Sequence, residues 1–356
     1  MSSIFVCFGT LESGGAERVL SVLSPYLADS FEEVTYVMWR KGKRFYDLDS
    51  RIKVIELPEL ADSDNIIRKA ISFRKMIKER HPELVISFLT PFNLLVLASL
   101  LHVDQKIAVA ERNDPRFIKG GCIMNAIRRY LYNKADAIFC QTDKMAEFFS
   151  GRLHDKTHVI YNPLFIDSKF VGKALQTPKS KYIVSVGRLN SQKNYSMLID
   201  GFNKFHASHP DYILRIYGEG ELRPTLQSKI NNLNLTDSIL LPGNDKNVHE
   251  NIANAQAFIM TSFFEGMPNA LIEAMALGLP CISTRVSGAT ELISHRNNGI
   301  LIDTTPEAIA QSLDEIVSNE ELREYISQQA VNITSILDQH TISHQWVEQI
   351  RQLINN

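Results

Sequence analysis

Short apolar runs alternate with longer segments of helical period along almost the whole chain, and this alternation restricts the possible folds more than any other feature. In the first half, the strand-like runs cover residues 3–8, 33–39, 52–57, 83–88, 105–110, 136–141 and 157–162. Clear helical patterns lie between them, for example at residues 15–29 and 65–80. Strands that alternate with helices in this way form a parallel sheet covered by helices. The first half therefore predicts a doubly wound α/β domain.

A second α/β pattern follows residues 162–181, a polar, Pro-containing segment without a clear period, which we interpret as an interdomain linker. The strand-like runs resume at residues 181–187, 212–218, 238–243, 256–262, 279–284 and 299–303. The length of 356 residues also favours two cores, because one domain usually has ~100 to 200 residues. We predict an N-terminal domain at 1–163 and a C-terminal domain at 164–340, with the amphipathic segment 341–356 packing back on the N-terminal domain.

The charge balance and the cysteines exclude several classes of protein. The 38 basic and 40 acidic side chains nearly cancel, whereas a nucleic-acid-binding domain is usually strongly basic. The four cysteines lack the CxxC spacing of metal sites and lie mostly in apolar segments, which is typical of buried thiols in a reducing cytosol. The chain shows no signal-peptide pattern, and no apolar run approaches the ~20 residues of a membrane span. We expect a cytoplasmic protein that at most binds a membrane surface.

Ligands of an open α/β sheet bind at the carboxyl ends of the strands, so the loops there are the first candidates for a functional site. Gly14 and Gly15 follow the first strand and open a helix, where their amides can approach an anion or a substrate closely. A tight turn without a ligand explains this pair equally well. Arg188 and Lys193 lie between a strand end and a helix, where the helix dipole disfavours cations unless an anion joins them. A diphosphate is such an anion, and two solvated cations are the alternative.

The segment Thr261–Thr284, "TSFFEGMPNALIEAMALGLPCIST", places two glutamates eight positions apart after a buried strand. Glu265 lies in the exit loop, followed by Gly266, Met267, Pro268 and Asn269, of which the proline suits the first helical turn. Glu273 lies about one and a half turns into an apolar helix. Because an ionised carboxylate only accepts hydrogen bonds, Glu273 suits the two adjacent hydroxyls of a ribose. A pairing with a neighbouring cation on the helix face is the alternative.

Taken together, these motifs resemble glycosyltransferase family 4, whose retaining enzymes have the two-domain GT-B fold. The resemblance rests on the Glu-x7-Glu element in "FFEGMPNALIEAMALGLPCISTRVSGATELI" and on "VGRLNSQKN", "SGGAERVL" and "VIYNPL". It covers essentially the whole chain, with the motifs in the family's order and spacing. It implies two Rossmann-like domains facing across a cleft, and transfer of a sugar from a nucleotide sugar with retention at the anomeric carbon and without a required metal.

The resemblance also implies a role for each matching residue. Arg188 and Lys193 would hold the donor diphosphate, and Glu265 would contact the hydroxyls of the donor sugar. These three would be catalytic, because cations that meet the charge of the departing phosphate stabilise the transition state. Glu273 would bind the ribose. The other donor-binding residues would be Gly14, Gly15, Asn244, Gly266, Met267, Pro268 and Asn269.

One loop of the N-terminal half departs from the family pattern. Many members carry a histidine near "VAERNDPRF" that contacts the donor sugar, whereas this chain has Glu111, Arg112 and Asn113. These three are candidate acceptor or sugar contacts, and Arg112 would serve the same hydroxyl or the acceptor's phosphate. "AERND" resembles the version in bacterial enzymes that extend lipid-linked oligosaccharides. The ten histidines show no metal-ligand spacing, and a lone one such as His249 is more often a surface or packing residue than a ligand.

The resemblance therefore implies an enzyme that transfers a hexosyl or N-acetylhexosaminyl residue from UDP-N-acetylgalactosamine, UDP-galactose or UDP-glucose to a polyprenyl-diphosphate-linked glycan, in capsule, O-antigen or related synthesis. A sugar-nucleotide epimerase of the same fold is one alternative, and release of free epimer without an acceptor would favour it. A non-catalytic subunit that binds nucleotide sugars is another. A hydrolase would need both glutamates to flank one scissile bond, whereas here one addresses the sugar and the other the nucleoside.

Basic residues are concentrated between residues 61 and 134, which hold 13 basic and 7 acidic side chains in a chain of net charge −2. The excess lies largely on the helical segments 66–80 and 117–133, whose apolar residues can face the sheet or a bilayer. Each basic residue near an anionic membrane contributes about 1 kcal/mol to binding. We expect the N-terminal domain to dock on an anionic inner-membrane surface through Arg68, Lys69, Arg74 and Lys75, and a solvated helix face is the alternative.

Overall fold

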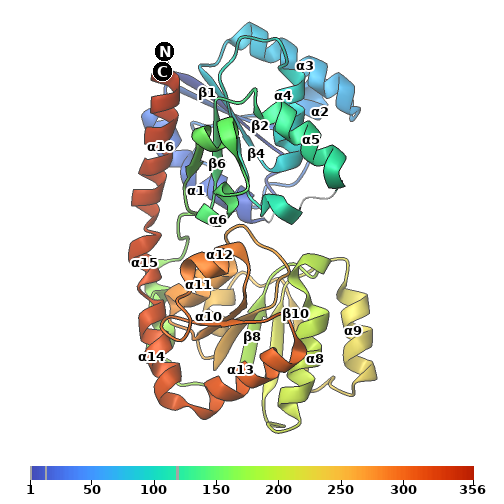
Figure 1. The fold of residues 1–356 in the computed structure, drawn as a ribbon, viewed down its shortest axis with the longest axis vertical. Helices are drawn as coiled ribbons and strands as arrows, with labels where there is room; N and C mark the ends of the chain where they lie inside the picture. Colours follow the sequence, from blue (N-terminus) through green and yellow to red (C-terminus); the bar gives the residue numbers. More distant parts are fainter. Residues whose placement is uncertain (1, 13, 118–119) are drawn as a thin grey trace. The chain divides into compact units, whose positions relative to one another are not determined.

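The computed structural model describes residues 2–12, 14–117 and 120–356, which form two compact units (Figure 1). The first unit consists of Met1–Pro163 together with Asp338–Asn356, and the second of Leu164–Leu337. The chain therefore passes from one unit to the other after residue 163, and it returns after residue 337 rather than after residue 340. No helix within the described residues combines the length and the apolar character needed to cross a membrane.

The first unit is built on a seven-stranded parallel sheet of order β3-β2-β1-β4-β5-β6-β7. The strands are β1 (Ser3–Phe8), β2 (Glu33–Met38), β3 (Lys53–Glu56), β4 (Leu84–Phe88), β5 (Ile107–Ala110), β6 (Ala137–Cys140) and β7 (Thr157–Val159). Each of the seven strand-like runs of the first half contains one of them. The strand order reverses between β1 and β4, which is the switch point where open α/β sheets bind ligands.

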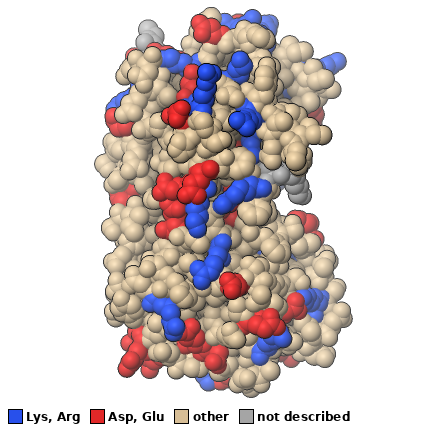
Figure 2. All heavy atoms as spheres, in the orientation of Figure 1, with Lys and Arg blue, Asp and Glu red and all other residues tan. Residues whose placement is uncertain are grey.

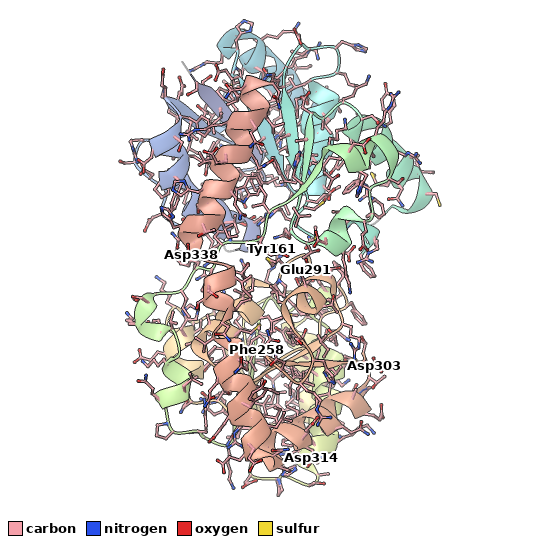
Figure 3. The ribbon with its side chains drawn as sticks, turned by 60° about the vertical axis from the view of Figure 1, so that its left-hand side comes forward. Tyr161, Phe258, Glu291, Asp303, Asp314 and Asp338 are labelled. Carbon is pink, nitrogen blue, oxygen red and sulfur yellow. The ribbon has the colours of Figure 1, made fainter. Side chains whose placement is uncertain are left out.

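Helices cover both faces of this sheet. Side chains of α1 (Gly15–Ser30) and α16 (Gln339–Asn355) share one core, and Figure 1 shows these two helices together. Within that core, Trp346 of α16 lies against the rings of Phe88 and Phe139, with centroids 5.5 and 4.9 Å apart. Asp338, labelled in Figure 3, caps α16 by accepting a hydrogen bond from the Thr341 amide at 2.8 Å. The C-terminal helix is therefore part of the first unit.

The opposite face is covered by α3 (Ile66–Arg80), α4 (Thr90–Ser99) and α5 (Gly121–Tyr132), whose buried side chains form the second core. The shorter helices of this unit are α2 (Leu57–Leu60), α6 (Asp143–Ala146), η1 (Pro115–Phe117) and η2 (Gly151–Lys156).

The second unit has a six-stranded parallel sheet of order β10-β9-β8-β11-β12-β13. Its strands are β8 (Tyr182–Val186), β9 (Ile213–Tyr217), β10 (Ile239–Gly243), β11 (Ala257–Met260), β12 (Cys281–Thr284) and β13 (Ile300–Ile302). Its main helices are α8 (Tyr195–His206), α9 (Arg223–Asn232), α10 (Val248–Ile252), α11 (Asn269–Leu277), α12 (Ser287–Leu292), α13 (Pro306–Ser318), α14 (Glu320–Ala330) and α15 (Ile333–Ile336). Two parallel-sheet, doubly wound domains are therefore confirmed.

The interpretation of residues 162–181 as a linker is wrong, because nearly all of this segment belongs to the second unit. It forms η3 (Ser168–Phe170) and α7 (Lys173–Gln176). Between them, the Gly172 amide donates a hydrogen bond to the Ala276 carbonyl of α11 at 2.9 Å. The segment lacks a period because it follows the surface of α10 and α11 in short turns, which leave no repeating pattern in the sequence.

Candidate active site

The loop between β11 and α11 carries the first of the two glutamates that the sequence singles out. Glu265 is buried in this loop, with its side chain 9% exposed. Its Oε1 accepts hydrogen bonds from Lys193 Nζ at 2.6 Å and from Ser262 Oγ at 2.8 Å. Its Oε2 accepts a weaker hydrogen bond from Gln192 Nε2 at 3.2 Å. A carboxylate and an ammonium group that the sequence places 72 positions apart therefore form one ion pair.

Adjacent strands explain how these two loops meet. β8 and β11 are neighbours in the sheet, so the loops at their carboxyl ends lie side by side. The Phe263 amide donates to the Gln192 carbonyl at 2.8 Å, and Thr261 Oγ1 donates to the Lys193 carbonyl at 3.1 Å. Gln192 and Ser262 were not predicted, because neither residue type is distinctive at its position in the sequence.

Arg188, the other predicted cation of this loop, is exposed. Within the described residues, no hydrogen bond or ion pair of its guanidinium is found. The glycines around it allow a close backbone approach: a Cβ on Gly218 would lie 2.0 Å from the Gly187 carbonyl oxygen. A Cβ on Gly187 would lie 2.9 Å from Cε of Lys193. Of the two cations of this loop, Lys193 is therefore paired with Glu265, whereas Arg188 is exposed.

The second glutamate, Glu273, lies within α11, where its side chain is 11% exposed. Its Oε2 accepts a hydrogen bond from Nε2 of His249, in α10, at 2.7 Å. His249 is therefore neither a surface residue nor a simple packing residue. This contact could not be predicted, because 24 positions separate the two residues and α10 has only five residues.

The rest of the β11–α11 loop forms a tight backbone path. α11 begins at Asn269, so Pro268 is its N-cap with an extended backbone and not part of the first turn as the sequence suggested. A Cβ on Gly288, in α12, would lie 2.3 Å from the Gly266 carbonyl oxygen and 2.8 Å from Met267 Cα. The loop is thus fixed by close packing. Asn244, which follows β10 at the same edge of the sheet, is exposed.

In the first unit, Gly14 is the N-cap of α1 and Gly15 is its first residue. A Cβ on Gly14 would lie 2.1 Å from a carboxylate oxygen of Glu17. Gly14 therefore makes room for the side chain of Glu17, in addition to any approach to a ligand.

Arg112 and Asn113 follow β5 at the same edge of this sheet. Arg112 is buried, its Nη2 donates to Oδ1 of Asn162, and its guanidinium lies 5.7 Å from the centre of the Phe88 ring. Burial lowers the pKa of Arg112 to about 9, which the charge of Glu17 partly offsets, so the guanidinium stays protonated at neutral pH. Asn113 is exposed.

Glu111 differs from the expectation of a sugar or acceptor contact, because its side chain is fully buried. Its two carboxylate oxygens accept hydrogen bonds from Thr90 Oγ1 and Tyr132 Oη, both at 2.5 Å. Burial raises the pKa of Glu111, although these hydrogen bonds and the charge of Arg128 favour the ionised form. Glu111 therefore fastens the β5 loop to α4 and α5 and leaves Arg112 and Asn113 as the candidate contacts.

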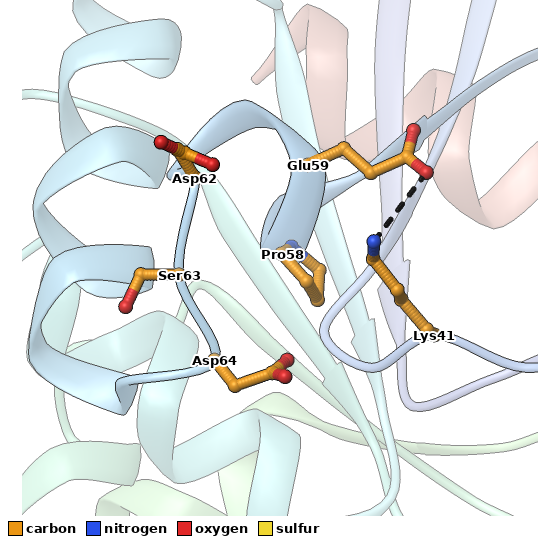
Figure 4. A pocket seen from close by; sticks show the side chains of 6 residues that line it. All are labelled: Lys41, Pro58, Glu59, Asp62, Ser63 and Asp64. Carbon is orange, nitrogen blue, oxygen red and sulfur yellow. Dashed lines mark ion pairs between the residues drawn. The ribbon is translucent and has the colours of Figure 1, made fainter.

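A polar hollow of about 430 Å³ lies elsewhere in the first unit, at the carboxyl ends of β2 and β3 (Figure 4). Its lining residues are Lys41, Pro58, Glu59, Asp62, Ser63 and Asp64. The ammonium of Lys41 lies 3.7 Å from the carboxylate of Glu59. None of the predicted site residues lines this hollow. Among the described residues, no group of three or more His, Cys, Asp or Glu side chains is arranged to hold a metal ion.

Comparisons with known proteins identify the family. The family model described as Glycosyltransferase Family 4 matches residues 13–167, and the one described as Glycosyl transferases group 1 matches residues 168–332. An uncharacterized glycosyltransferase of Methanocaldococcus jannaschii is 31% identical over 276 residues, which cover 70% of this chain and 67% of the relative.

Two further similarities extend over the full length. The Campylobacter jejuni GalNAc-α-(1→4)-GalNAc-α-(1→3)-diNAcBac-PP-undecaprenol α-1,4-N-acetyl-D-galactosaminyltransferase is 26% identical over 367 residues, covering 100% of both chains. The crystal structure of Anabaena HepE in complex with UDP-glucose has the same fold, with a TM-score of 0.79 and 16% identity over 99% of this chain and 100% of that one. The chain therefore belongs to glycosyltransferase family 4 and is a glycosyltransferase with the GT-B fold.

Proposed function

We propose that this enzyme transfers a hexosyl or N-acetylhexosaminyl residue from a UDP-sugar to a polyprenyl-diphosphate-linked glycan, with retention at the anomeric carbon. UDP-N-acetylgalactosamine, UDP-galactose and UDP-glucose are the candidate donors. The observation that carries the proposal is that the two glutamates lie in different environments, which suits two different parts of one donor. Glu265 lies beside the cation Lys193, and Glu273 lies beside His249. The name of the Campylobacter relative, which specifies N-acetylgalactosamine transfer to an undecaprenol-linked glycan, and the UDP-glucose bound to HepE support it.

Negative charge develops on the diphosphate when the bond between the sugar and the nucleotide breaks. Arg188 and Lys193 neutralise this charge, and the backbone amides of the loop from Gly266 to Asn269 donate hydrogen bonds to the same diphosphate. Fixed donors at a developing charge stabilise a transition state. The diphosphate offers Lys193 a second anionic partner besides Glu265. Glu265 then accepts hydrogen bonds from hydroxyls of the donor sugar. No metal is needed for this charge stabilisation.

The remaining predicted residues contact the two substrates, the donor and the acceptor. Glu273 accepts hydrogen bonds from the ribose, and the exposed Asn244 serves the nucleotide. Gly14 and Gly15 approach the donor, while Arg112 and Asn113 contact the acceptor. Retention follows from attack on the face from which the nucleotide departs, with the departing phosphate taking the proton of the acceptor hydroxyl. The product would enter capsule, O-antigen or related polysaccharide synthesis.

Thermal unfolding in the presence of nucleotides and nucleotide sugars tests the donor class. We expect UDP and at least one of the three UDP-sugars to raise the unfolding midpoint, because a ligand that binds only the folded state stabilises it. ADP- and GDP-sugars should have a much smaller effect. Equal stabilisation by ADP- and UDP-sugars, or none by any UDP compound, would refute the UDP-sugar assignment.

We also propose that the first unit docks peripherally on the anionic cytoplasmic face of the membrane, where a polyprenyl-diphosphate acceptor is embedded. Two of the four cations expected to dock serve the fold instead. Lys69 is buried and donates to the Trp39 carbonyl at 3.0 Å, and Arg74 donates to the carbonyls of Ser99 and Leu101 at 2.8 Å. Lys119, which contributes to the basic excess, lies outside the described residues. Basic and acidic side chains are interspersed on the face drawn in Figure 2.

Outward-facing apolar side chains of α5 and α3 supply the second part of such a surface. On α5, Ile123, Ile127 and Tyr130 are 76%, 44% and 60% exposed, and their spacing of four and three residues puts them on one face of the helix. On α3, Ile67 and Ile71 are also exposed, followed along the helix by the exposed Lys75 and Lys78. An apolar stripe next to cations is typical of helices that lie in a membrane interface.

Changing Arg68, Lys75 and Lys78 together to Gln should weaken binding to anionic vesicles at low salt, by about 1 kcal/mol per cation. Changing Ile123 and Ile127 to Ser should weaken binding at both low and high salt. Activity on a short, water-soluble acceptor should persist in both variants. The matched control changes Arg51, Lys53 and Arg351, three exposed cations elsewhere on the same unit, to Gln. Equal vesicle binding by the wild type, the α3 variant and the control in a sedimentation assay would exclude this docking surface.

A further inference from the structure

His249 and Glu273 form a nearly buried pair between two helices of the second unit. Their side chains are 16% and 11% exposed, and Nε2 of His249 donates to Oε2 of Glu273 at 2.7 Å. Each oxygen of an ionised carboxylate has about two lone pairs, so the hydrogen bond from His249 uses one of about four acceptor sites.

The imidazole is itself held from a second side. The ring of Phe170, from η3, packs edge-on against it with the ring centroids 5.7 Å apart. Lys173 of α7 lies 3.8 Å from the carboxylate of Glu250, the neighbour of His249, and the Gly172 amide anchors the same segment to α11. The segment at residues 168–176 therefore packs against α10, the helix that carries His249.

We propose that His249 is a positioning residue for nucleotide recognition, which holds the Glu273 carboxylate in the orientation that accepts the ribose hydroxyls. This inference rests on the proposed function, because it assigns the ribose to Glu273. A glutamate side chain has three rotatable torsions, and a binding group performs best when neighbouring groups lock its rotamer. The hydrogen bond to His249 supplies this constraint. His249 does not contact the sugar or the diphosphate in this scheme, so it governs affinity for the donor and not the chemical step.

The His249→Ala variant should bind UDP about ten-fold more weakly, the size of effect expected when a hydrogen bond to a charged group is lost. Its KM for the donor should rise by a similar factor, while kcat at saturating donor stays within about two-fold, because the ribose contact is lost equally in the ground state and in the transition state. The His249→Gln variant, whose amide can donate to the same carboxylate oxygen, should recover part of the affinity.

A readout specific to the ribose separates positioning from a general structural effect. Isothermal titration with UDP and with 2′,3′-dideoxy-UDP measures how strongly each variant distinguishes the two ligands. The wild type should prefer UDP, His249→Ala should lose most of this preference, and Glu273→Gln should lose it as well. The double variant should be no worse than Glu273→Gln alone, because both changes remove the same contact. His209→Ala, which removes a histidine paired with Asp314 at 2.8 Å in the same unit, is the matched control and should keep the preference.

Two outcomes overturn the inference without touching the proposed function. One is a UDP preference that Glu273→Gln abolishes and His249→Ala leaves intact. The other is a loss of affinity in His249→Ala that is equal for UDP and for the dideoxy compound. If the wild type binds no UDP, or if Glu273→Gln keeps the full preference for the ribose hydroxyls, the proposed function itself is in error.

Discussion

Replacing Arg188 with alanine is expected to lower turnover by about 100- to 1,000-fold, the usual cost of losing one donor that stabilises a developing charge. UDP affinity should fall as well, because the diphosphate carries negative charge before the reaction starts. The fold should be unaffected, since Arg188 is exposed and no partner of its guanidinium is found within the described residues. Steady-state kinetics, titration with UDP and a thermal unfolding midpoint check the three parts of this prediction.

Lys193→Ala provides the informative contrast. Turnover and UDP affinity should fall as in the Arg188 variant, but the unfolding midpoint should fall too. The reason is that the variant leaves Glu265, whose side chain is 9% exposed, without the cation that it contacts at 2.6 Å. Leaving a buried charged group without its partner lowers the free energy of unfolding. If either variant binds UDP as tightly as the wild type, the assignment of that residue to the diphosphate is wrong.

The second large effect should come from Glu265→Gln, which is expected to lower turnover far more than UDP affinity. Its proposed contacts are to the donor sugar, and UDP lacks this sugar. The neutral side chain also ceases to compete with the diphosphate for Lys193, so UDP binding should be unchanged or slightly tighter. A loss of about 100-fold or more in kcat is the expected size for a group acting in the transition state.

Glu273→Gln should show the opposite pattern, with weaker binding of free UDP and a smaller loss of turnover at saturating donor. Both glutamate variants retain the shape of the side chain, so the comparison isolates the charge. Titration of the two variants with UDP alone is the decisive measurement. Equal losses of UDP affinity would contradict the division of roles between the two residues.

The parallel sheets could be predicted because their strands are buried on both faces and therefore leave continuous apolar runs in the sequence. All thirteen strands of the structure lie within the runs that the pattern identified. The order and spacing of several motifs together indicated the family, which no single short motif can establish. α11 ends at Gly278, which has the positive φ that favours glycine, and a glycine after an apolar helix is a common sequence signal for a helix end.

Contacts between distant segments could not be predicted. The partners of Glu265 and Glu273 lie on other elements, and nothing in a single sequence shows which loops meet. For the same reason, the basic pattern of α3 did not reveal that Lys69 and Arg74 are bound to backbone carbonyls. Glu111 was misinterpreted because its burial depends on Thr90 and Tyr132, which belong to two other helices.

Proton NMR of the complete reaction tests whether this enzyme transfers a sugar from a UDP-sugar with retention. The wild type is incubated with each of the three UDP-sugars and a short-chain polyprenyl-diphosphate-linked N-acetylgalactosamine acceptor, with Arg188→Ala as the background control. We expect release of UDP with one of these donors and a new α-linkage, identified by its small anomeric coupling. A β-linked product, release of a free C2-epimer with UDP, or no UDP release from any of the three donors would contradict it.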